Sequence, residues 1–141
     1  MMTRYLLAFI LIFSSVASMS CAPTTKQVLA TRESQVKLRA MQTRAFDTTD
    51  EEKMLRTVIA ALQDLGFIID KADDVLGTVS GTKLDRYALR ITVTVRPRGE
   101  TQLLVRASAQ YGIYAVEAPG PYQQFFETLS KALFLTAHQV E

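Results

Sequence analysis

The sequence has little of what metal binding or redox chemistry requires. It contains one cysteine (Cys21), one histidine (His138) and no tryptophan in 141 residues. A zinc site needs three or four nitrogen or sulfur ligands, and a single cysteine forms no disulfide within its own chain. His138 falls in the last turn of a predicted helix, where a cationic group suits the negative helix terminus. The composition therefore predicts no metal, no cofactor and a domain stabilised by its core alone.

Motifs of catalysis are also missing. Gly77 and Gly81 fall inside a predicted strand and do not open a helix, so they form no phosphate-binding loop. There is no Gly-x-Ser-x-Gly elbow. Asp70, Asp73 and Asp74 lack the ligand spacing of a calcium loop and indicate a solvated turn. We expect a protein that is not an enzyme; a hydrolase whose carboxylates meet only in space is the least favoured alternative.

The charge is nearly balanced. The chain carries 16 basic and 14 acidic residues. Residues 1–20 hold one of the basic residues, Arg4, and no acidic one, so the chain without them has a net charge of +1. Nucleic-acid binding and electrostatic attraction to a membrane both need a concentrated basic surface. We therefore expect neither as the main activity.

The N-terminus has the pattern of a cleaved export signal. One positive charge in Met1–Arg4 precedes an uncharged apolar run, Tyr5–Val16. This run matches a signal core and is shorter than the roughly 20 residues of a membrane-spanning helix. Small residues then lead to Cys21, so we assign residues 1–20 to a signal peptide.

Cys21 is the candidate site of lipid attachment. Its place directly after the small residues of "SVASMSC" resembles the lipobox of bacterial lipoproteins, in which this cysteine is acylated. Ser18 departs from the pattern, which has an aliphatic residue three positions before the cysteine. The resemblance implies a membrane anchor, and Ala22 implies sorting to the outer membrane. Cleavage after Ala17 or Ala22, giving a soluble periplasmic protein, is the alternative.

The rest of the chain predicts a tether, residues 21–35, and one α+β domain, residues 36–141. We expect a first strand at Val36–Phe46 and then a helix that opens with a Thr49–Glu52 capping box and stops at Gly66. The apolar residues of this helix fall on one face. They are Met54, Leu55, Val58, Ile59, Leu62 and Leu65.

Four strands are expected next, at Phe67–Asp70, Val75–Leu84, Tyr87–Val95 and Thr101–Tyr111. The last two alternate apolar and polar residues, as half-buried antiparallel strands do. The turns are "KADD" and "RPRGE", and a loop at Gly112–Gly120 leads to a helix from Pro121. The predicted order is β-α-β-β-β-β-α, a two-layer sandwich with an antiparallel sheet of four to five strands and two helices on one face. The second helix has this apolar face: Tyr122, Phe125, Phe126, Leu129, Leu133 and Thr136.

The alternation also predicts a candidate partner surface. Arg90, Arg96 and Arg106 fall on the sheet face away from the helices, with Leu104 as an apolar point. Arginine is enriched in protein interfaces because its planar fork pairs with carboxylates. Phe134 lies off the apolar face of its helix and joins the candidate surface, with Tyr114 and Val116 as a further apolar contact. An ordinary solvated sheet face is the alternative.

One segment carries a family resemblance. "AALQDLGFIIDKADDVLGTVSGTK", with "QTRAFDTTDEEKML" before it and "PYQQFFETLSKALFLTAHQVE" after it, is similar to a group of uncharacterised proteobacterial outer-membrane lipoproteins. Its helix-strand-turn-strand unit more distantly resembles the domains of the β-barrel assembly lipoprotein BamC. The resemblance implies a helix-grip-like α+β fold and an accessory, non-catalytic role, and it transfers no active-site residues.

These patterns together predict a non-catalytic lipoprotein of the outer membrane, facing the periplasm. Its domain would bind another envelope protein in an assembly, transport or secretion machine. The alternative is a small-molecule or lipid-binding domain with a groove between helices and sheet. Small residues at Gly77, Gly81, Ala107 and Ala109 would leave room for that groove.

The anchor gives the first testable prediction. Mass spectrometry of the processed chain should find an N-terminal Cys21 that carries a diacylglyceryl group and an acylated amine. An unmodified N-terminus at Ser18 or Pro23 would instead make the protein a free periplasmic one.

Overall fold

The computed structural model describes residues 25–138, with the backbone alone for 25–33, 85 and 136–138. The signal peptide and Cys21 lie outside the described residues. The chain divides into two units, Met1–Glu33 and Ser34–Glu141. In the first unit the described residues, 25–33, are helical. The second unit holds the sheet and the core.

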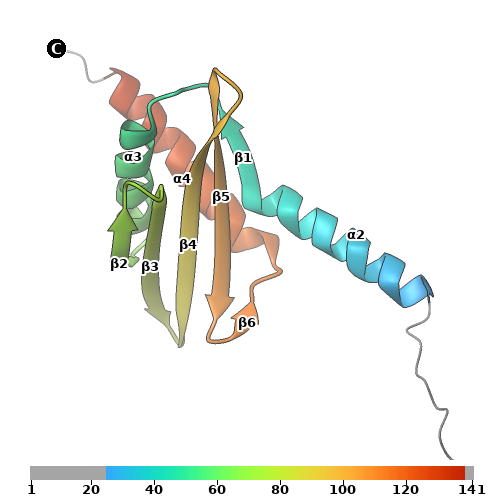
Figure 1. Cartoon of the computed structure of the whole chain (residues 1–141). Helices are drawn as coiled ribbons and strands as arrows, with labels where there is room; N and C mark the ends of the chain where they lie inside the picture. The colour runs from blue at the N-terminus through green and yellow to red at the C-terminus, as the bar shows by residue number, and fades with distance from the viewer. Residues whose placement is uncertain (1–24, 139–141) are drawn as a thin grey trace, which may run out of the picture. The chain divides into compact units, whose positions relative to one another are not determined.

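The second unit has an α+β fold (Figure 1), as predicted. Its strands form one antiparallel sheet in the order β1-β5-β4-β3-β2, and β6 pairs with the same edge of β5 as β1. The helices α3 and α4 pack against one face of this sheet through a single apolar core. The elements are α2 (Thr25–Gln42), β1 (Thr43–Phe46), α3 (Glu51–Asp64), β2 (Ile68–Asp73), β3 (Thr78–Asp85), β4 (Tyr87–Arg98), β5 (Gln102–Tyr111), β6 (Tyr114–Ala115) and α4 (Pro119–His138).

The predicted first strand is wrong over most of its length. Only Thr43–Phe46 is a strand, and the residues before it belong to α2, which begins at Thr25 inside the segment expected to be a tether. Most of α2 consists of good helix formers such as Lys, Gln, Leu, Ala, Arg and Glu. Leu38 and Met41 pack against the core. Their spacing of three residues is helical, although the short segment around them also resembles a partial alternation.

Helix α3 matches its prediction except at its first residue. The N-cap is Asp50, whose side chain accepts a hydrogen bond of 2.9 Å from the Lys53 backbone N–H, so the expected Thr49–Glu52 capping box is wrong. The predicted apolar face is buried or half-buried. Gly66 stops the helix with a φ of +83°, a conformation that favours glycine.

The alternation predicted for β4 and β5 is confirmed. Their odd-numbered residues from Leu89 to Val95 and from Leu103 to Ala109 are buried, and the even-numbered ones face away from the core. Three strand ends differ from the prediction by more than one residue. Asp73 still belongs to β2, and Gly77 lies in the turn before β3 with a φ of +56°. Strand β4 continues through "RPR" to Arg98.

Pro97 is tolerated in β4 because of where its missing N–H would point. Val95 donates its N–H to the Gly77 carbonyl at 2.8 Å, on the β3 side of the strand. Two residues later the backbone nitrogen points the same way, and β3 begins only at Thr78, opposite Thr94. Pro97 therefore removes no ladder hydrogen bond, and β4 stays paired with β5 through Pro97 and Arg98.

Helix α4 begins at Pro119, two residues before the predicted start, and the expected loop before it contains β6. Tyr122, Phe125, Phe126 and Leu129 are buried in the apolar core with almost no exposure. The Phe125 and Phe126 rings meet edge to face, with 5.1 Å between their centroids. The side chain of Thr136, predicted on this face, lies outside the described part of the chain.

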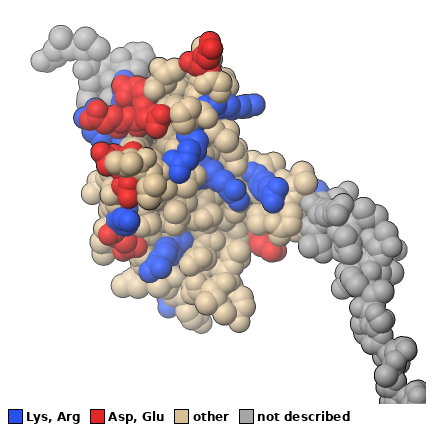
Figure 2. Space-filling view, in the orientation of Figure 1, with Lys and Arg blue, Asp and Glu red and all other residues tan. Residues whose placement is uncertain are grey.

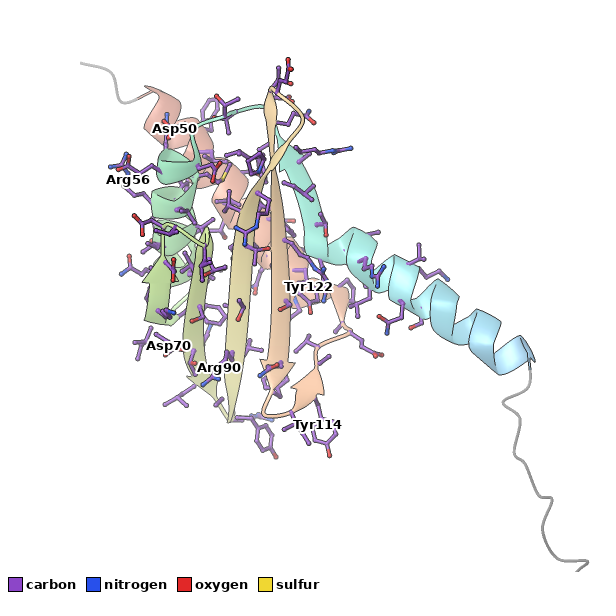
Figure 3. All side chains as sticks on the ribbon, viewed as in Figure 1. Asp50, Arg56, Asp70, Arg90, Tyr114 and Tyr122 are labelled. Atoms are coloured by element: carbon purple, nitrogen blue, oxygen red, sulfur yellow. The ribbon has the colours of Figure 1, made fainter. Side chains whose placement is uncertain are left out.

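The hydroxyl of Tyr122, which is labelled in Figure 3, joins four segments of the domain through its hydrogen bonds. It accepts hydrogen bonds from the Ala109 N–H at 3.3 Å and from the Gln42 side-chain amide at 3.2 Å, and it donates to the Val116 carbonyl at 2.6 Å. Val116 donates its own N–H to the Ala109 carbonyl at 2.9 Å. The hydroxyl therefore stands between β5 and the chain leaving β6, at the point where direct pairing ends.

Removal of this hydroxyl should destabilise the domain. Tyr122→Phe leaves a buried N–H, a buried carbonyl and the Gln42 amide each without a partner, so we expect a loss of about 1–3 kcal/mol in the free energy of unfolding. Urea denaturation measures it. Tyr114→Phe is the control, because Tyr114 is exposed, and it should change stability by less than about 0.5 kcal/mol. Equal effects of the two variants would contradict this role.

Candidate functional site

The outer face of the sheet gathers the arginines predicted to share a surface. The register pairs Arg90 with Gln110, Arg96 with Leu104, and Thr94 with Arg106. All of these side chains lie on the face away from α3 and α4, because the residues between them in sequence form the core. The structure therefore brings Arg90, Arg96, Leu104 and Arg106 onto one surface.

Arg98 belongs to the same surface, although it is absent from the predicted set. It pairs with Gln102 at the end of β4, and it is exposed. The predicted strand ends at Val95 because Pro97 is typical of a turn. Even-numbered positions carry Arg90, Arg96 and Arg98 alike, so the alternation extended past Pro97 would identify it. We call Arg90, Arg96, Arg98, Arg106 and Leu104 the arginine face.

The arginines differ in how firmly they are held. Arg96 donates through Nη1 to the carbonyls of Leu76 and of Val95, the latter at 3.0 Å, so it fastens the turn before β3 to β4. Arg106 lies 3.5 Å from the Gln42 Oε1. Arg90 is exposed on the middle strands of the sheet (Figure 3). Arg90 and Arg98 are thus the side chains most available to a partner.

Two carboxylates lie at the edges of the arginine face. Asp70 accepts a hydrogen bond from Thr82, the partner of Arg90. Asp47 accepts one from Gln102, the partner of Arg98. Figure 2 shows Lys and Arg across the sheet, with many of the Asp and Glu side chains gathered over α3 and β2. Among the described side chains the ion pairs are Arg56–Glu52 at 3.1 Å and Lys71–Asp73 at 3.6 Å. No described carboxylate therefore forms an ion pair with an arginine of this face.

Of the three aspartates predicted in a solvated turn, Asp70 and Asp73 belong to β2 and only Asp74 lies in the turn. Asp73 accepts a hydrogen bond from the Leu76 N–H at 2.8 Å, and Asp70 accepts one from the Thr82 hydroxyl at 2.6 Å. Among the residues that the structure describes, no three His, Cys, Asp or Glu side chains are grouped to hold a metal ion. No described helix is long and apolar enough to cross a membrane.

Phe134 does not join the arginine face. It lies on α4, which covers the opposite side of the sheet. It is also about 20 Å along the helix axis from the start of α4, where the chain arrives from Tyr114. Val116 is buried, so the expected apolar contact of Phe134, Tyr114 and Val116 is wrong. Phe134 and Leu135 are instead a separate exposed pair near the end of the described chain.

A pocket of about 180 Å³ opens between the end of α3, the start of α4 and the sheet. One wall includes Lys83, whose Nζ donates to the Leu65 carbonyl at 2.8 Å and so caps the end of α3. Ala107, Ala109 and Gly81 are among the small residues predicted to leave room for a ligand groove. Ala109 lines this pocket and Ala107 does not. Gly81 lies next to Phe67, which is part of the pocket wall. The lining is Leu65, Phe67, Lys83, Leu89, Ile91, Ala109, Tyr111, Pro121, Gln124 and Phe125.

Gly77 leaves room for the close packing of Arg96 and the Val95 carbonyl, which gives a prediction at this site. A Cβ there would lie 2.6 Å from the Val95 carbonyl oxygen and 2.7 Å from the Arg96 Nη1. We expect Gly77→Ala to lower the free energy of unfolding by about 1–3 kcal/mol more than Gly112→Ala, measured in urea. Gly112 is the matched control, because it has a similar φ, +59°, but open space around it. Equal losses would show that the close approach to Val95 is unimportant.

Comparison with known proteins leaves the site to be interpreted from its geometry. No protein-family model and no curated protein matches the chain. The features that a functional proposal has to explain are the arginine face, the pocket and the exposed apolar side chains at the ends of the domain.

Proposed function

We propose that this protein is a non-catalytic lipoprotein that binds another envelope protein through the arginine face. Cys21 would anchor it in the outer membrane, with the domain in the periplasm. The observation that carries the proposal is a sheet face that no described helix covers, with four arginines that form no ion pair with a described carboxylate. The partner is expected to present an acidic surface.

The size of the face fits an interface of modest strength. Ten residues of a strand span about 33 Å and four strands span about 19 Å, so the face covers roughly 600 Å². A standard protein interface buries about 800 Å² on each partner. Leu104 is half-buried and offers little apolar area of its own. We therefore expect a reversible complex that depends on charge.

The charge makes the complex sensitive to salt. Each exposed arginine–carboxylate pair contributes at most about 1 kcal/mol and is screened beyond about 8 Å at physiological ionic strength. Complementary charges mainly accelerate association and exclude wrong partners. Fast, selective and reversible association suits an accessory component that joins and leaves an envelope machine.

The pocket supports a second candidate, a small-molecule or lipid-binding domain. Its apolar wall and the Lys83 ammonium suit a small amphipathic ligand with a negative end. Its volume of about 180 Å³ is below the roughly 300–1,000 Å³ of most ligand sites. A second pocket, of about 280 Å³ between α3, β2 and β3, is also below this range, so we place this function second.

Photocrosslinking in intact cells tests the leading proposal. A photoreactive amino acid at Ser108, an exposed position between Arg106 and Gln110, should form a crosslink to a protein partner. The same amino acid at Gln123, exposed on α4, should not. The double variant Arg90→Glu, Arg106→Glu should lose most of the Ser108 crosslink, because it reverses charge on the face.

Arg56→Glu is the charge control, since Arg56 is an exposed residue of α3 that lies off the face and is paired with Glu52. It should leave the crosslink intact. A crosslink that is absent, or that is equally strong in the charge-reversed double variant, would contradict a partner on the arginine face. A ligand-binding domain would give the first of these results.

A further inference from the structure

Two turns place large apolar side chains at one end of the sheet. The β3–β4 turn carries Leu84 and Tyr87, which are 82% and 75% exposed. The β5–β6 turn carries Ile113 and Tyr114, which are 89% and 75% exposed. Leu89, two residues after Tyr87, pairs with Tyr111 at the end of β5, so the two turns are neighbours. We call Leu84, Tyr87, Tyr111, Ile113 and Tyr114 the tip.

Neither the turns nor the core requires these side chains. The turns depend on positive φ at Arg86 and at Gly112, and they make no use of large apolar neighbours. Exposures of 75% or more show that Leu84, Tyr87, Ile113 and Tyr114 bury little area in the domain. Apolar side chains gathered at one exposed place mark a contact with another apolar phase or molecule.

The chemistry of the tip is that of a membrane interface. It has three tyrosines, whose rings are apolar and whose hydroxyls stay hydrated, and two aliphatic residues. Arg86 is exposed in the same turn as Tyr87, and Arg90 lies three residues further along β4. The neighbouring acidic residues in the sequence are Asp85 and Glu117. Arg86, in the turn itself, suits an anionic headgroup, whereas Arg90 belongs to the arginine face.

The shape favours a bilayer over a protein partner. Protein hot spots are side chains that enter a fitted pocket and are surrounded by contacts that exclude water. The tip side chains instead stand on two turns that project from the end of the sheet, as Tyr114 does in Figure 3. A fluid lipid surface accepts such a projection without a preformed partner shape.

We propose that the tip inserts into the headgroup region of a phospholipid bilayer and so orients the domain on the membrane. The proposal rests on the proposed function because it takes from it the lipid anchor at Cys21. A few partly inserted side chains bind a bilayer weakly, and stable attachment needs a second signal, which the acylated Cys21 supplies. The arginine face, which lies along the sheet and not at its end, stays available to a protein.

The absence of tryptophan from the chain allows a direct test. In Tyr114→Trp the new side chain is the sole tryptophan, at an exposed site of the tip. The processed variant, purified from membranes, is reconstituted into vesicles of phosphatidylethanolamine and phosphatidylglycerol that also contain a phosphatidylcholine with brominated acyl chains. We expect quenching of its fluorescence relative to vesicles without bromine, and an emission shift to shorter wavelength relative to the protein in detergent-free buffer.

Val75→Trp is the matched control, because Val75 is 89% exposed in the turn at the other end of β3. Its tryptophan should be neither quenched nor shifted. Equal quenching of the two variants, or none in Tyr114→Trp, would overturn the proposal. So would an emission shift that depends on an added envelope protein and not on lipid.

The failure of the anchor and the failure of the tip are separate results. A mass spectrum without acylated Cys21 contradicts the proposed lipoprotein, whatever the fluorescence shows. An acylated chain that resides in the vesicles with an unquenched tryptophan at position 114 contradicts the tip alone. The Ser108 crosslink reports independently on the arginine face.

Discussion

The hydrogen bonding along one edge of β5 depends on the Tyr122 hydroxyl. Strands β1 and β6 both pair with one edge of β5 and leave a gap between them at Ala109. The hydroxyl fills this gap by accepting from Ala109 and Gln42 and donating to Val116. Since a buried backbone group without a partner costs about 1–3 kcal/mol, this one atom fixes the end of α2, the β6 loop and the start of α4 against β5.

The sheet face that α3 and α4 cover holds the core, so the surfaces available to a partner lie elsewhere on the sheet. Once α3 and α4 cover the inner face, the described core is filled by aromatic and aliphatic side chains. The pockets beside it include one of about 180 Å³ at the start of α4 and one of about 280 Å³ between α3, β2 and β3. The outer face keeps arginines that no described helix covers, and the end of the sheet keeps exposed tyrosines and aliphatic residues. We therefore assign the two proposed contacts to different surfaces, with a protein on the face and a bilayer at the tip.

Long regular patterns in the sequence are the most predictive. Strict alternation in β4 and β5 is enough to identify the core positions and to assign Arg90, Arg96, Leu104 and Arg106 to one face. Helix α2 is not predictable in the same way, because its two core contacts, Leu38 and Met41, give too little periodicity to separate a helix from a strand. Apart from Tyr114, the tip escapes prediction too, because which turns become neighbours depends on strand register and not on local sequence.

Arginine-selective labelling with a dicarbonyl reagent tests the central claim, that the arginine face is covered by a partner in the envelope. The account predicts that Arg90 reacts readily in the purified protein and is protected in intact envelopes, while Arg56 on α3 reacts equally in both. Raised salt should remove the protection of Arg90, because screening weakens the pairing of exposed charges. Equal reactivity of Arg90 in purified protein and in envelopes would contradict the account.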